Sequence, residues 1–119
     1  MVSMTAIPPL AAAHVPILAG TDLGNPGTAA GASLHGELEY LVEAGLTPVQ
    51  ALIAATSAPA DSFRLTDRGR IAPGLRADLL LVDGDPSTDV LATRNILAIW
   101  KGGVMYDRQA WRDRVASWK

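Results

Sequence analysis

The spacing of hydrophobic positions changes along the first half of the chain, and each spacing predicts a different element. A continuous apolar run at residues 15–19 has no polar alternation, which is typical of a short buried strand. From residue 33 to residue 44 the apolar side chains recur three and four positions apart, which predicts a helix that Gly45 ends. Residues 23–32 lie between these elements, and their Gly, Asn and Pro content predicts a loop.

Three further helices are indicated by the residues that would cap them. The segment 47–55 has the clearest start, because Thr47 and Gln50 have the spacing of a capping box. A short helix is expected at 58–63, after a Thr-Ser pair that can cap it. Another is expected at 10–14, where two prolines can occupy the first turn.

The pattern of apolar runs and glycine turns in the second half of the chain predicts a small sheet. The expected elements are a strand at 77–82, a hairpin of strands at 96–101 and 104–107, and a final helix at 109–118 that carries Trp111 and Trp118 on one face. Gly102 and Gly103 supply the hairpin turn. The order of strand, helices and then strands predicts an α/β chain.

Composition narrows the functions that this chain can have. It has 119 residues and a net charge of −2, and its ten basic residues form no stripe, which argues against nucleic-acid binding. There is no cysteine, so no disulfide or thiolate site is expected. No apolar run reaches the roughly 18 residues of a membrane span. The apolar start is interrupted by prolines and lacks a basic region, so we expect no signal peptide and a cytoplasmic location.

Asp22 is the first candidate for chemistry, because it follows the apolar run at 15–19 almost directly. In α/β proteins, ligands bind at the carboxyl ends of the strands. A carboxylate placed there can bind a metal or accept a proton from metal-bound water. An Asp can equally cap the next turn through its side chain, and the sequence leaves both interpretations open.

His35 is the second candidate, early in the predicted helix at 33–44. It could contact a substrate, or it could pair with Glu39 at i,i+4 on the helix surface, and we favour the surface pair. His14 precedes the apolar run and is interpreted as structural.

The remaining charged clusters are interpreted as structural. Asp78 is expected to tie the preceding turn by accepting backbone N–H groups. The acidic residues that follow do not have EF-hand spacing and are interpreted as turn residues: Asp83, Asp85 and Asp89. A local group of arginines is interpreted as solvated surface rather than an anion site: Arg64, Arg68, Arg70 and Arg76.

Four blocks of sequence together resemble one known family. The blocks are "VPILAGTD", "LHGELEYLVEAGLTPVQALIAATSAPA", "GRIAPGLRADLLLVDGDP" and "ILAIWKGGVMYDR". In this order and spacing they are similar to the C-terminal part of the metal-dependent amidohydrolases, in the imidazolonepropionase and prolidase-like branch. The resemblance implies a (β/α)₈ barrel fragment at 1–66, containing the last strand and the following helices. It also implies half of a small β-sandwich at 67–108 and a C-terminal helix at 109–119.

The resemblance also implies roles for single residues. Asp22 would be the family's strand-eight aspartate, which binds a catalytic divalent metal, with zinc expected, and moves the proton of the attacking water. Asn25 and His35 would lie toward the substrate pocket. The reaction implied is hydrolysis of a C–N bond in an amide or a cyclic amide.

The family's other metal ligands have no counterpart in this sequence. The His-x-His pair of strand one, the bridging Lys or Glu and the two middle-strand histidines are absent. A zinc site needs at least three protein ligands, so Asp22 alone should hold no metal and the chain alone should be inactive.

Two functional classes are therefore carried forward. The chain is part of a hydrolase that a complementing N-terminal amidohydrolase chain completes, with a small-molecule substrate, or it is a non-catalytic relic that associates with itself. In the second case we expect a homo-oligomer with its contact near the strand at 77–82 and Trp100.

Overall fold

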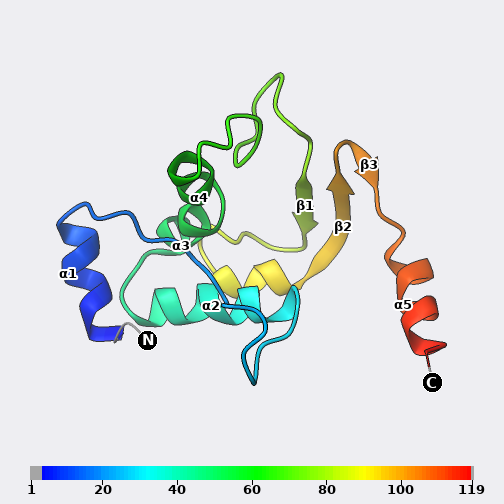
Figure 1. Ribbon diagram of the computed structural model, residues 1–119, viewed down its shortest axis with the longest axis horizontal. Coiled ribbons are helices and arrows are strands. Elements are labelled where there is room, and N and C mark those ends of the chain that lie inside the picture. The colour runs from blue at the N-terminus through cyan, green and yellow to red at the C-terminus, as the bar shows by residue number, and fades with distance from the viewer. Residues whose placement is uncertain (1–3, 119) are drawn as a thin grey trace.

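The computed structural model describes residues 4–118, in which helices come first and a small sheet follows (Figure 1). The helices are η1 (Met4–Ala6), α1 (Ile7–Ala12), α2 (Ala32–Glu43), α3 (Pro48–Ala55) and α4 (Ser57–Ser62). The later elements are β1 (Leu79–Val82), the 3₁₀ helix η2 (Val90–Arg94), β2 (Ile96–Lys101), β3 (Val104–Met105) and α5 (Arg108–Ala116). The three strands form one antiparallel sheet in the order β1-β2-β3.

The core lies where α2, α3 and η2 meet. Its buried residues are Leu38, Leu41, Leu46, Ala51, Ala54 and Val90. Val90 is the member from η2, which lies between β1 and β2 in the sequence. The segment that connects β1 to β2 therefore supplies a residue to the core formed by α2 and α3.

The start of α3 confirms the predicted capping box. The Gln50 N–H donates to Thr47 Oγ1 over 3.2 Å, and the Thr47 N–H donates to Gln50 Oε1 over 2.8 Å. A cap of this kind stabilises a helix by about 1 kcal/mol. Two N–H groups that the helix itself cannot satisfy are thus paired locally, which is why the sequence alone could place this helix.

The strand predicted at 15–19 is wrong as an element, because the structure has no strand there. The Val15 N–H donates to Leu10 O, and the Ala19 N–H donates to Ala54 O at the end of α3. Ile17 and Ala19 pack against the core. A strand needs a second backbone beside it, and within residues 4–118 the strands lie in the β1-β2-β3 sheet, which does not include this segment.

The sheet exposes apolar side chains on both faces. Leu80 and Leu81 are neighbours on β1, so their side chains point to opposite faces, yet they are 48% and 50% exposed. On β2 and β3, Leu97, Val104 and Met105 are also exposed. Such a sheet has the composition of a layer that is covered on both sides.

The hairpin and the last helix match the predictions in type but are shorter. β1 begins at Leu79 and β3 ends at Met105. α5 ends at Ala116, so Trp118 lies beyond the helix, and both Trp111 and Trp118 are exposed.

Candidate functional site

Asp22 lies in the connection between α1 and α2, where it holds an unusual backbone conformation. Its φ angle is 48°, in the left-handed region that Asp and Asn tolerate better than other side chains with a Cβ. Its exposed carboxylate accepts a hydrogen bond from Asn25 Nδ2 at 2.6 Å, and the same amide donates to Asp22 O at 3.1 Å. The structure thus brings together two of the three predicted site residues in one turn.

His35 lies in the first part of α2 and is half-buried. Its Nδ1 is 3.0 Å from Thr93 Oγ1 on η2. The predicted pair with Glu39 is wrong, because Glu39 forms an ion pair with Arg94, also on η2. The sequence could not show that His35 and Glu39 each contact a residue of η2, because these contacts depend on the packing of η2 against α2.

A hollow of about 380 Å³ opens between the 21–28 connection and one face of α2. Its polar lining consists of Thr21, Thr28, Ser33, Glu37, Tyr40 and Arg94. Asp22, Asn25 and His35 are not among the lining residues. No pattern in the sequence indicates this hollow, because Arg94 reaches it from a distant segment.

The described residues do not fit a complete metal site. Between residues 4 and 118, no group of three or more His, Cys, Asp or Glu side chains is placed to hold a metal ion. A structural or catalytic zinc ion takes at least three protein ligands. Asp22 can supply one carboxylate, and no reaction step through a metal follows from this chain by itself.

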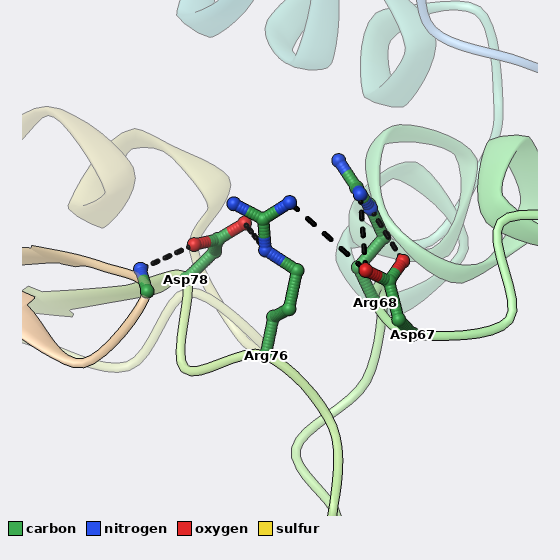
Figure 2. Close-up of polar contacts among 5 residues, drawn as sticks. Asp67, Arg68, Arg76 and Asp78 are labelled. Carbon is green, nitrogen blue, oxygen red and sulfur yellow. Dashed lines mark hydrogen bonds and ion pairs between the residues drawn. The ribbon is translucent and has the colours of Figure 1, made fainter.

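Two of the arginines predicted as surface, Arg68 and Arg76, are paired with carboxylates (Figure 2). Arg68 donates twice to Asp67, at 2.8 and 3.1 Å, and holds the pKa of that carboxyl below its usual value. Arg76 lies between Asp67 and Asp78, at 4.0 and 3.6 Å. Asp78 accepts the Gly102 N–H at 2.7 Å, so its backbone bond reaches the hairpin turn rather than the preceding turn. These exposed pairs stabilise the fold only modestly.

The other acidic residues behave as turn and cap residues. Asp85 Oδ1 accepts hydrogen bonds from the Ser87 N–H and Oγ, which lower the Asp85 pKa. Asp89 caps η2 by accepting the Leu91 N–H. Arg70 forms two hydrogen bonds to Asp61. Arg68, Arg70 and Arg76 are therefore each paired with an aspartate, and they do not form an anion-binding site.

The environment of His35 predicts how stability depends on pH. Burial lowers the pKa of His35, the charge of Arg94 lowers it further, and Glu39 opposes them. Between the folded pKa and the unfolded value of about 6.5, the unfolded chain binds more protons. The free energy of unfolding should therefore fall as the pH drops through about 6.5, and level off below the folded pKa. Urea unfolding from pH 8 to pH 5 would measure this.

The matched variants for this prediction are His35→Gln and His14→Gln. His35→Gln should remove this part of the pH dependence, whereas His14→Gln should keep it. A His35→Gln chain with the same pH dependence as the wild type would contradict the prediction.

The comparisons with known proteins assign the class of this fold. The sequence model of the amidohydrolase family matches residues 2–106, so the chain belongs to the amidohydrolase family. Imidazolonepropionase from Pyrobaculum arsenaticum is 49% identical over 71 residues, which cover 59% of this chain and 18% of that protein. Adenine deaminase from Lysinibacillus sphaericus is 39% identical over 71 residues, which cover 60% of this chain and 11% of that protein.

Solved structures support the same assignment. A Xaa-Pro dipeptidase with methionine in its active site aligns with a TM-score of 0.77 at 28% identity, covering 87% of this chain and 25% of that chain. Another amidohydrolase aligns with a TM-score of 0.74 at 29% identity and the same coverage. The predicted class, part of an amidohydrolase α/β fold, is confirmed. The chain spans about a tenth to a quarter of the length of these relatives.

The helices between residues 4 and 118 include none that is both long and apolar enough to cross a membrane.

Proposed function

We propose that this chain forms part of an amidohydrolase that hydrolyses a C–N bond in an amide or cyclic amide, and that Asp22 is the carboxylate it contributes. The observation that carries the proposal is the Asp22–Asn25 turn at the end of the family block "VPILAGTD". Asn25 holds the Asp22 carboxylate through Oδ2. The Asp22 carboxylate is exposed, and we propose that its other oxygen, Oδ1, binds the metal.

The relatives support the bond class rather than one substrate. Their names include a deaminase, an imidazolonepropionase and a Xaa-Pro dipeptidase. Because specificity in such folds is set by individual sites, we propose only a small molecule with a C–N bond to be hydrolysed. Asn25 and His35 are proposed as its contacts.

A divalent metal, with zinc proposed, would supply an activated water in the complete enzyme. Asp22 would provide one ligand, and the others would come from residues that this sequence does not contain. The chain alone is therefore proposed to be inactive. Complementation tests this: the chain mixed with a polypeptide carrying the family's His-x-His segment should hydrolyse an amide substrate that neither part hydrolyses alone. Failure to restore hydrolysis while the two parts associate would contradict the proposal.

The isolated chain should bind far less than one zinc ion. One exposed carboxylate cannot replace the three or more ligands of a zinc site. Elemental analysis after dialysis against zinc measures this directly, with Asp22→Asn as the matched control, which should give the same value. About one tightly held zinc per chain would contradict the prediction and would indicate ligands shared between chains.

For the partner, we propose a homo-oligomer or the complementing chain. β1 is an edge strand with exposed leucines on both faces, and an unpaired edge favours association. Light scattering should show more than a monomer, with tryptophan fluorescence changing on dilution, and a dilution-stable monomer would contradict this. Co-purification with a second polypeptide would favour the enzyme over the non-catalytic module. A cytoplasmic location stays a prediction.

A further inference from the structure

Thr93 on η2 makes two hydrogen bonds through one hydroxyl group. The residue is 5% exposed, so water does not readily satisfy its side chain. Thr93 Oγ1 lies 2.8 Å from Val90 O and 3.0 Å from His35 Nδ1. A hydroxyl has one proton to donate, so only one of these contacts can use it.

The carbonyl of Val90 can only accept, and therefore the hydroxyl proton must point to it. The contact with His35 then requires the ring to donate from Nδ1. We infer that Thr93 is a positioning residue that holds His35 in the Nδ1–H tautomer and leaves Nε2 as an unprotonated acceptor.

The charges around the ring support the neutral form. Arg94 on η2 and Glu39 on α2 are the charged groups that act on His35. Because Glu39 is engaged by Arg94, it does not pair with the ring. Within residues 4–118, no group donates a hydrogen bond to Nε2. The ring thus carries one donor that is used and one acceptor that is open.

This inference deepens the role of His35 and, for the ligand, rests on the proposed function. An Nε2 without a proton binds a group that donates, such as an amide N–H or an ammonium. It does not bind a carboxylate in this form. In the substrate contact proposed above, His35 would then accept a hydrogen bond from the N–H side of the C–N group.

Nuclear magnetic resonance of the isolated chain, with ¹⁵N-labelled histidine, tests the tautomer. The spectrum is recorded at about pH 8.5, above the ordinary pKa of histidine, and His14, the one other histidine, is an internal reference. Wild-type His35 should show a protonated Nδ1 and an unprotonated Nε2. Thr93→Val, which keeps the shape but removes the hydroxyl, should move His35 toward the Nε2–H form of free histidine. Thr93→Ser should keep the wild-type pattern.

Two results would overturn the inference: an unprotonated Nδ1 in the wild type, or an unchanged His35 in folded Thr93→Val. If Thr93→Val does not fold, the wild-type spectrum and Thr93→Ser still decide. Because this experiment needs no activity, its failure is distinct from failure of the proposed hydrolase function.

A kinetic test applies to the complemented enzyme. Thr93→Val should raise KM for an amide substrate about 2- to 10-fold with little change in kcat. This is the loss of affinity expected when one hydrogen bond between His35 and the substrate is removed. Thr93→Ser should restore KM. A fall in kcat with unchanged KM would overturn the ligand assignment.

Discussion

Replacing Asp22 by Asn should lower kcat of the complemented enzyme about 10²–10⁴-fold, the usual loss when a positioned acid or base is removed. The amide has nearly the shape of the carboxylate but cannot accept a proton. The left-handed backbone at Asp22 favours this test, because Asn tolerates a φ of 48° as well as Asp does. The amide oxygen can also keep the hydrogen bond from Asn25. Initial rates with saturating substrate would measure the loss.

Asp113→Asn is the matched control for Asp22→Asn. Asp113 is an exposed residue of α5 that accepts a hydrogen bond from Gln109, and the proposed site does not use it. Its substitution should leave kcat unchanged. Equal rates for Asp22→Asn and the wild type, with assembly intact, would show that Asp22 is not the reacting carboxylate.

Replacing Gly69 by Ala should cost roughly 2–5 kcal/mol of the free energy of unfolding. Gly69 has a φ of 89°, and an alanine there pays about 1–2 kcal/mol. An added Cβ would also lie 2.5 Å from Ala60 Cβ and 2.9 Å from Thr56 O. Overpacking of this kind costs about 1–3 kcal/mol. Since small domains are stable by about 5–15 kcal/mol, the variant should be close to unfolding.

Gly74→Ala separates these two causes. Gly74 has a similar φ of 84°, but nothing lies within 4 Å of the added Cβ. It should therefore lose only the backbone part, about 1–2 kcal/mol. Urea unfolding of both variants measures the difference. Equal losses would mean that α4 does not pack against Gly69 as the structure places it.

The elements that local chemistry determines could be predicted from the sequence. The capping box at Thr47 uses residues three positions apart, and the hairpin around Gly102 joins adjacent strands. Both were placed correctly for this reason. η2 was not predicted, because its helix is short and is held by burial of Val90 among residues far away in the sequence.

The candidate site was predicted less completely. The turn that joins Asp22 to Asn25 is local, and the family block pointed to it. The partners of His35 come from η2, so no pattern within α2 could reveal them. The same applies to the segment at 15–19, whose hydrophobicity is real but whose strand needs a neighbouring backbone. The functional roles of Asp22, Asn25 and His35 stay predictions.

The docking of η2 on α2 has a consequence for how the chain folds during synthesis. His35 and Thr93 are 58 positions apart, and ribosomes add about 5–20 residues per second. For several seconds, therefore, the nascent helices have no Val90 to complete their core, and Leu38 and Leu41 remain partly uncovered. Closing so long a loop is slow compared with forming the helices. The core is most exposed after α3 has been synthesised and before η2 has been. During this interval a chaperone would find the largest apolar surface to bind.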